Sequence, residues 1–252
     1  PSSGRVVVNG LEESLARVLN QGCWSEVRSF GATVSDFSAQ GEADAFEVLE
    51  RGAPVGQVTW QLSGVHNQLN ALAAIAAAQH VGVAPAASCA ALREFTNAKR
   101  RMELLGIVNG VTVYDDFAHH PSAIRTTVDG LRRKVGANRI LAVFEPRSNT
   151  MKLGTMKSQL PWSLEQADLA FCHSGGLGWD PREPLAAMGD RASAAASVDE
   201  LLAQVLRAAR PGDHVLFMSN GGFGGIHARL LAALEAAHQL LVSSAGRAAS
   251  EG

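Results

Sequence analysis

The sequence lacks the features that mark nucleic-acid-binding and membrane-bound proteins. Its 252 residues carry 22 Lys and Arg against 24 Asp and Glu, a net charge of −2, without a long run of either sign. A basic patch is the electrostatic requirement for binding nucleic acid or an acidic lipid surface, so neither partner is expected. The longest apolar helical stretch, residues 69–78, is far shorter than a membrane span. No signal-peptide pattern opens the chain.

Cysteine is scarce as well. Cys23, Cys89 and Cys172 are widely separated, odd in number and without CxxC spacing. We therefore expect reduced thiols in a cytoplasmic protein rather than a disulfide framework. The chain starts without Met, in a Ser-Gly turn that leads into an apolar strand, so we expect it to belong to something longer.

Several catalytic and nucleotide-binding motifs are absent. No GxxxxGKS or GxxxxGKT phosphate loop occurs, so this chain alone has no evident way to hold a triphosphate. The glycine-rich loop 219–225 is not a dinucleotide fingerprint, because GxGxxG needs glycine where His227 stands. Without HxxxH or HExxH spacing no zinc site is expected, and without GxSxG no serine hydrolase.

What the chain does contain is a strong hairpin signal in its middle. Residues 102–108 form an apolar-rich run and residues 111–114 a second strand-like run. Asn109-Gly110 between them is the typical two-residue hairpin turn, since both positions favour a left-handed backbone. The pattern predicts a β-hairpin over this stretch.

A cluster of polar residues follows the hairpin directly. Asp115, Asp116, His119 and His120 precede Pro121, which suits the first turn of a helix because its missing N–H would be unpaired there anyway. In α/β sheets ligands bind where strands end, and helix N-termini favour phosphate. Each residue alone could be a turn former or a cap, but the four together predict a site.

Beyond residue 121 helix and strand patterns alternate strictly, which predicts a parallel sheet with helices on both faces. Residues 99–252 are therefore expected to form a Rossmann-like α/β domain, and residues 1–98 a separate one. The expected strands are 139–144, 169–172 and 214–218, and the expected helices are 123–134, 157–166, 198–209 and 226–241.

Two loops of this domain carry candidate ligand contacts. The loop 145–150 offers one guanidinium and small hydrogen-bonding side chains, and Arg147 could clamp a carboxylate or phosphate with its two-pronged guanidinium. The alternative is a plain surface arginine. The loop 219–225 lets backbone N–H groups approach a ligand closely before a helix. The candidate contacts are Arg147, Ser148, Asn149 and Ser219.

The first hundred residues predict a strand at 5–8, a hairpin of 46–51 with 55–62, and a long helix that ends near His80. His66, Asn67 and Asn70 fall in the first turns of that helix. Asn67 and Asn70 share a face, because residues three apart do so on a helix. Asn67 could be a helix cap, whereas Asn70 lies deeper, where a ligand contact explains it better.

These motifs together resemble the Mur ligases, a family of ATP-dependent ligases of bacterial cell-wall synthesis. The resemblance rests on Gly64-x-His66-Asn67-x-x-Asn70 with its Ala-rich continuation, on Arg100-Arg101 before the hairpin, and on the stretches YDDFAHHPSAI, FEPRSNTMKLG and MSNGGFGGIH. It covers roughly residues 1–240. It implies that residues 1–98 are the end of an α/β, P-loop-type central ATP-binding domain and that residues 99–252 are the family's C-terminal domain.

The resemblance also implies roles for individual residues. Arg101 contacts the nucleotide phosphates, Asp116 the ribose or the nucleotide's coordination, and His119 lies near the phosphates. These roles make Asp116 and His119 the expected catalytic residues. His66, Asn67 and Asn70 line the nucleotide site, with Asn70 on adenine. The residues that face the incoming peptide are Arg147, Ser148, Asn149 and Ser219.

The chemistry implied is amide-bond formation through an acyl phosphate. By resemblance the substrates are ATP, UDP-N-acetylmuramate and the tripeptide L-alanyl-γ-D-glutamyl-meso-diaminopimelate, with Mg²⁺ held mostly by residues upstream of this chain. A chain without the phosphate loop is expected to be inactive alone. Family members that add L-alanine to the same sugar nucleotide are one alternative, and a non-catalytic Rossmann-like nucleotide-binding module is another. The sequence indicates no oligomeric state.

Overall fold

A computed structural model of the chain describes residues 3–62, 64–96 and 98–250, except for the side chains of 238 and 240–250. The chain divides into two compact units, Pro1–Asn97 and Ala98–Gly252. Asn97, which belongs to the stretch where a domain boundary was expected, lies outside the described residues. Each unit is described below by itself.

The first unit is a mixed sheet with two helices packed on it. Its strands follow the order β1-β2-β3-β4-β5, with β1, β2 and β3 paired in parallel and β3, β4 and β5 antiparallel. The expected hairpin at 46–62 is confirmed by β4 and β5. The elements are β1 (Arg5–Asn9), α1 (Glu13–Leu19), β2 (Glu26–Phe30), β3 (Phe37–Glu42), β4 (Ala45–Glu50), β5 (Ala53–Thr59), α2 (Val65–His80) and α3 (Pro85–Arg93).

The core of this unit forms because alternate residues of β4 and one face of α2 are apolar. Phe46 and Val48 point inward from β4 and meet Leu72 and Ile75 of α2. The strand expected to be buried at 5–8 is only half-buried, because β1 lies at the margin of the sheet order. Among the described residues β1 pairs with β2 alone. Its other side therefore has no neighbouring strand to bury it.

The second unit is a Rossmann-like sheet in the order β10-β9-β8-β11-β7-β6. All neighbouring pairs are parallel except β6 with β7. The mixed α/β class with a parallel sheet is therefore confirmed. The elements are β6 (Glu103–Val108), β7 (Val111–Asp116), α4 (Pro121–Val135), β8 (Ile140–Phe144), α5 (Asn149–Lys152), α6 (Leu160–Ser163), β9 (Leu169–His173), α7 (Arg182–Leu185), β10 (Ala192–Ala195), α8 (Val198–Ala208), β11 (His214–Met218) and α9 (Ile226–Ser250).

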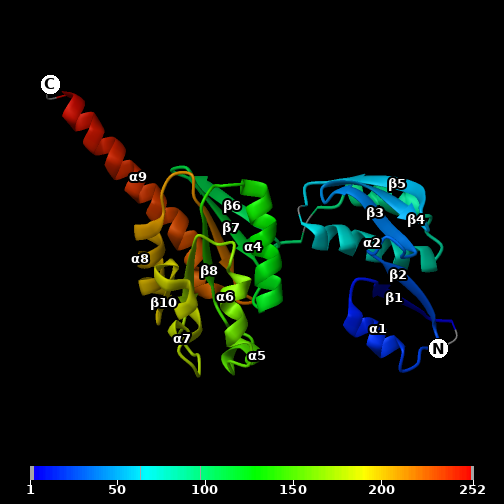
Figure 1. The fold of residues 1–252 in the computed structure, drawn as a ribbon. Helices are drawn as coiled ribbons and strands as arrows, with labels where there is room; N and C mark the ends of the chain where they lie inside the picture. The colour runs from blue at the N-terminus through cyan, green and yellow to red at the C-terminus, as the bar shows by residue number, and fades with distance from the viewer. Residues whose placement is uncertain (1–2, 63, 97, 251–252) are drawn as a thin grey trace. The chain divides into compact units, whose positions relative to one another are not determined.

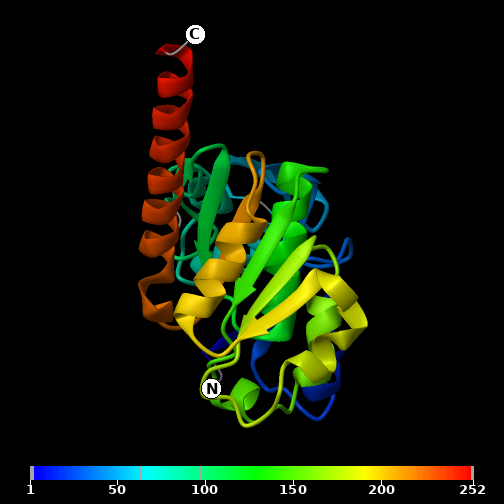
Figure 2. The ribbon, with the colours of Figure 1, turned by 90° about the vertical axis from the view of Figure 1, so that its left-hand side faces the viewer.

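Helices cover both faces of this sheet, as Figures 1 and 2 show. The chain crosses from β7 to β8 through α4, and the apolar stripe of α4 packs on one face around Ile124, Val128 and Leu131. The opposite face packs against α8 and the first turns of α9, around Val205 and Leu230. β8 is buried along its whole length because it lies between these two cores.

The hairpin predicted from Asn109-Gly110 is present. Asn109 has φ 50° and Gly110 φ 74°, the two left-handed positions that a type I′ turn requires. β6 and β7 pair antiparallel on either side of this turn. Gly110 also packs against the chain before β11, because a Cβ at Gly110 would lie 3.1 Å from the Cβ of Pro211.

The helix expected at 157–166 is present only in part. A 3₁₀ turn over Lys157–Gln159 continues directly into the short α6, and the helical stretch ends at Ser163. Pro161 cannot donate the hydrogen bond that a continuous α-helix through 157–166 needs. The strand β10 and the helix α7 were not foreseen either, because the Ala-rich run 192–195 has no clear period of two.

Two glycines of the second unit should respond in opposite ways to alanine. Gly110→Ala should lower the free energy of unfolding by about 1–2 kcal/mol, since a left-handed backbone is costly for any residue with a Cβ. Gly130→Ala should raise it by about 0.5–1 kcal/mol, because Gly130 lies inside α4 with open space around its Cβ position. Urea unfolding followed by circular dichroism measures both, and shifts of the same sign would contradict the turn assignment.

Candidate functional site

The strand order brings three polar loops to one edge of the second sheet. β8, β11 and β7 are neighbours and run parallel, so the chain leaves all of them at the same edge. The segments that follow are 117–121 after β7, 145–150 after β8 and 219–225 after β11. Ser219 N–H donates to Asp116 O and Glu145 N–H to Met218 O, so the ends of these strands stay connected. This edge is the candidate site of the unit.

The adjacent aspartates of β7 point to opposite faces of the sheet, because side chains alternate along a strand. Asp115 lies on the side of α9, with Oδ1 3.3 Å from His227 Nε2. Asp116 lies on the side of α4, where it accepts a 3.3 Å hydrogen bond from Thr127 Oγ1. The sequence grouped them as one polar cluster, and the structure separates them into two sets of contacts.

Asp116 is buried and bonded within the protein. Met102 N–H donates to Oδ2 and Ala118 N–H to Oδ1, both at 2.8 Å. Burial raises the pKa of Asp116 above its ordinary value, although these bonds and the charge of Arg101 act in the opposite direction. The carboxylate therefore fixes the two segments that flank the strand end. Its contact with a nucleotide stays a prediction.

Asp115 forms a second buried set with Arg100 and His227. Arg100 Nε donates to Asp115 Oδ2 at 2.8 Å, and Arg100 Nη2 donates to Ser219 O at 2.6 Å. Burial pushes the pKa of Asp115 up, but the interactions with His227 and Arg100 outweigh it and hold the pKa below its ordinary value. Arg101 is exposed beside this buried set.

The expected histidines lie at the start of α4. His120 is the N-cap residue of the helix, with its Nδ1 3.3 Å from Ser122 Oγ. His119 is half-buried, with Nδ1 2.9 Å from Phe117 O and its ring edge-on to the Phe117 ring. Pro121 occupies the first turn as predicted. The N-terminal end of a 15-residue helix thus faces the same edge, which favours anions there.

Arg147 is the exposed cation of the loop after β8. Its Nη1 lies 4.0 Å from Glu145 Oε2, and its side chain is 52% exposed. A Cβ on Gly221 would lie only 2.2 Å from Arg147 Nη1, so the guanidinium rests directly on that glycine. Glu145 Oε2 also accepts a 2.6 Å hydrogen bond from Ser219 Oγ. Arg147 is therefore held from both loops.

The remaining predicted peptide contacts differ in exposure. Ser219 is fully buried, and its Oγ accepts from Gly221 N–H at 3.0 Å; its side chain therefore supports the loop and does not face solvent. Ser148 is the N-cap of α5, where its Oγ accepts from Met151 N–H at 3.4 Å. Asn149 is exposed. Arg147 and Asn149 are thus the members of this set that a ligand can reach directly.

The predicted adenine-side residues fall in the first unit. His66 and Asn67 are half-buried in the first turn of α2, and Asn70 is exposed one turn later. The N-cap of α2 is Gly64, and Asn67 N–H donates to Gly64 O. Asn67 therefore does not cap this helix. The roles of the three residues toward adenine stay predictions.

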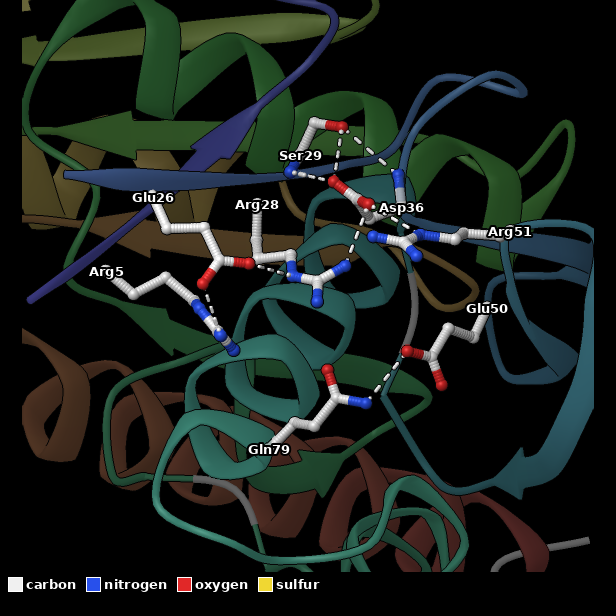
Figure 3. Close-up of polar contacts among 8 residues, drawn as sticks. All are labelled: Arg5, Glu26, Arg28, Ser29, Asp36, Glu50, Arg51 and Gln79. Carbon is white, nitrogen blue, oxygen red and sulfur yellow. Dashed lines mark hydrogen bonds and ion pairs between the residues drawn. The ribbon is translucent and has the colours of Figure 1, made fainter. Parts of the chain in front are cut away.

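The first unit also has a hollow of about 410 Å³ between the loop 33–36 and the turn at 51–52. Asp36 borders it, and Figure 3 shows how its carboxylate is used within the unit. Asp36 Oδ1 accepts from Arg28 and Arg51 at 3.0 and 3.1 Å, while Oδ2 accepts from Ser29 N–H at 3.0 Å. Burial raises the pKa of Asp36, but these bonds outweigh it and lower the pKa below its ordinary value. We therefore read this cluster as a structural tie.

Neither a metal centre nor a membrane span is evident in the part of the chain that the structure describes. No group of three or more His, Cys, Asp or Glu side chains there could hold a metal ion. Within the same residues, no helix is both long and apolar enough to cross a membrane.

Sequence reasoning gave no role to Arg100, Glu145, His173 and His227. All four lie at this edge, and His173 Nδ1 is 3.7 Å from Glu145 Oε1. Glu145 and His173 each directly follow a predicted strand, so the strand-end rule could have selected them. The pairing of His227 with Asp115 has no local signal, because it depends on the packing of α9 beside β7.

Comparison with known proteins agrees with this geometry. Residues 100–221 match a family model described as Mur ligase, glutamate ligase domain. The chain is 49% identical over 235 residues to a UDP-N-acetylmuramate–L-alanyl-gamma-D-glutamyl-meso-2,6-diaminoheptandioate ligase from Escherichia coli (strain K12). This match covers 92% of the chain and 51% of the relative, so the chain spans about half the length of that ligase.

A solved structure gives the same result. The chain superimposes with a TM-score of 0.75 on the crystal structure of a murein peptide ligase from Psychrobacter arcticus 273-4, at 39% identity over 93% of this chain and 52% of that one. A UDP-N-acetylmuramate–L-alanine ligase from Acaryochloris marina is 38% identical over a shorter stretch, 54% of this chain and 29% of the relative.

The cluster around Asp36 predicts how the first unit responds to acid. A carboxylate whose pKa is lowered on folding contributes stability above its unfolded pKa of about 3.9, and this stability is lost as pH falls through the folded pKa. Asp36→Asn should lower the stability of the first unit at neutral pH and flatten its loss below about pH 4. Hydrogen exchange of amides in β2 and β3 at a series of pH values measures this.

Asp44→Asn is the matched control, because it removes an exposed carboxylate of the same unit. An equal effect of the two substitutions, at neutral and acidic pH, would contradict the role given to Asp36.

Proposed function

The chain belongs to the Mur ligase family, and we propose that it is part of an ATP-dependent ligase that joins UDP-N-acetylmuramate to the tripeptide L-alanyl-γ-D-glutamyl-meso-diaminopimelate. The observation that carries the proposal is the 49% identity over 92% of the chain to a relative named for this reaction. The product returns murein peptide to cell-wall precursors in the cytoplasm.

The chain's share of the ligase follows from its length relative to that protein. Since it covers 51% of the relative, we assign residues 1–98 to the end of the central ATP-binding domain and residues 99–252 to the C-terminal domain. These 252 residues contain no GxxxxGKS or GxxxxGKT phosphate loop. We therefore expect no ligase activity from this stretch by itself.

The reaction consists of two transfers between substrates. The muramate carboxylate attacks the terminal phosphorus of ATP and displaces ADP, which gives an acyl phosphate. The peptide's free amine, after losing a proton, then attacks the acyl carbon, and phosphate leaves. Such chemistry depends on positioning and charge stabilisation rather than on an enzyme nucleophile. Mg²⁺ would neutralise phosphate charge in this chemistry, and no group of three or more His, Cys, Asp or Glu side chains among the described residues could hold the ion.

Several groups at this edge fit the binding of phosphate and carboxylate. We assign Arg101 and His119, beside the N-terminus of α4, to the nucleotide phosphates, and Asp116 to holding this end of the site. His66, Asn67 and Asn70 are assigned to the nucleotide from the first unit. Arg147 and Asn149 are assigned to the peptide, with Ser148 and Ser219 supporting their loops.

Phosphate release by the ligase that contains this chain tests the proposal. The assay supplies ATP, Mg²⁺ and UDP-N-acetylmuramate with either the tripeptide or L-alanine, and omits the sugar nucleotide as a control. We expect release that depends on the tripeptide. Release with L-alanine alone would identify the L-alanine-adding activity of the family, and no release with either would favour a nucleotide-binding module.

Substitutions of Arg147 and of the adjacent Gly221 test whether this arginine binds the peptide. Arg147→Ala should raise the KM for the tripeptide about tenfold to a hundredfold and leave the KM for ATP unchanged, since an arginine–carboxylate contact is lost. Gly221→Ala should act in the same direction, because the new Cβ would displace the guanidinium.

Gly222→Ala is the matched control for Gly221. Gly222 has φ −74°, and a Cβ there meets nothing within 4 Å. Steady-state kinetics with each substrate varied in turn separate these outcomes. A Gly221→Ala enzyme with an unchanged KM for the tripeptide would exclude Arg147, in its present position, from peptide binding.

A further inference from the structure

We infer that Arg100, Asp115 and His227, named here the clasp, are positioning residues that hold Arg101 for contact with the nucleotide phosphates. The inference rests on the proposed function and deepens it, since it adds residues that do not touch substrate themselves. Arg101 is the exposed cation next to the clasp.

Arg100 is fixed through its side chain and its main chain. Its guanidinium joins Asp115 of β7 to the Ser219 carbonyl at the end of β11, at 2.8 and 2.6 Å, and lies over the Phe117 ring. Its N–H donates to Glu103 Oε2 at 2.7 Å, and its carbonyl accepts from Phe117 N–H at 2.8 Å. An arginine with this many bonds has little rotational freedom left.

His227 completes the clasp from α9. Its Nε2 lies 3.3 Å from Asp115 Oδ1, the oxygen that Arg100 does not use. The imidazole packs on the Phe217 ring, with centroids 4.7 Å apart. The side chains of Asp115 and His227 are only 10% and 15% exposed, so water screens the contact between carboxylate and imidazole weakly. Asp115 thus faces Arg100 with one carboxylate oxygen and His227 with the other.

The backbone on both sides of Arg101 is strained, so the clasp holds a local conformation as well as stabilising the fold. Arg100 has φ 60° and Met102 φ 50°, both left-handed and neither glycine. Such residues are strained, and they persist where the surrounding structure over-determines them. Met102 is held by its N–H to Asp116 Oδ2. Arg101 is therefore presented between two residues that are each fixed in an unusual conformation.

This arrangement sets the direction in which residue 101 leaves the chain. The charge of Arg101 acts on Asp116 at the end of β7, and relaxing Arg100 to an ordinary backbone conformation would change the direction in which Arg101 leaves the chain. Small displacements of a positioning group cost large factors in rate. The clasp therefore keeps Arg101 in the position in which it contacts the phosphate during the reaction.

Kinetics of the ligase that contains this chain test the clasp. Asp115→Asn, His227→Gln and Arg100→Lys should each raise the KM for ATP about tenfold while the KM for the tripeptide stays unchanged. Arg100→Lys keeps the charge but cannot bridge Asp115 and Ser219 at once. It remains informative if Asp115→Asn fails to fold, because it leaves no buried charge without a partner.

A double-mutant cycle separates positioning from a merely structural role. If the clasp acts through Arg101, Arg100→Lys should change kcat/KM for ATP less than about twofold in an Arg101→Ala background, against about tenfold in the wild type. Equal effects in both backgrounds would overturn the inference, and so would an unchanged KM for ATP in the single variants.

Asp168→Asn is the matched control. Asp168 pairs with Arg132 at 2.5 Å and accepts from Ile140 N–H at 2.7 Å, at the opposite end of β8 from the site. It should leave both KM values unchanged. A wild-type ligase without ATP-dependent phosphate release would refute the proposed function itself, whereas an active wild type with additive cycles would refute the clasp alone.

Discussion

The buried carboxylate of Asp116 is the constraint on which the edge of the second unit depends. It accepts the main-chain N–H groups of Met102 and Ala118, so it connects the chain where it enters the unit to the chain where it leaves β7. Burial makes this charge costly, and the raised pKa of Asp116 reflects that cost. The cost is offset only while both donors are in place. The positions of Arg101 and of the α4 N-terminus follow from that requirement.

Because side chains alternate along a strand, the neighbouring aspartates of β7 have different roles. Asp116, on the α4 face, organises main-chain segments, whereas Asp115, on the α9 face, organises the cation Arg100 and the imidazole of His227. Because the two carboxylates lie on opposite sides of the sheet, they do not share one proton or one ligand. A sequence motif of adjacent acids thus becomes two independent supports, each fixing a different part of the same edge.

Local patterns predicted most of the second unit, and long-range packing accounts for what they missed. Asn109-Gly110 determines the hairpin by its backbone preference alone, and the alternation after Pro121 determines the parallel sheet. The helix expected at 157–166 begins as a 3₁₀ turn and ends at Ser163, because Pro161 within it cannot donate a helical hydrogen bond. Local sequence periodicity does not determine the order of the strands in a sheet. The contacts of Ser219 with Arg100 and of His227 with Asp115 depend on β11 entering between β7 and β8, so neither could be derived from the sequence.

The groups present at this edge limit the chemistry that it can perform. The Ser219 hydroxyl is buried and donates to Glu145, and burial raises the pKa of the Cys172 thiol well above its ordinary value. Neither is therefore an accessible, activated nucleophile. Arg101 and Arg147 are exposed, and the first turn of α4 lies at the same edge. Fixed positive charge and oriented N–H groups stabilise anions without forming a covalent intermediate on the protein. An acyl phosphate, whose formation and breakdown develop charge on oxygen, is the kind of species that such an edge can orient.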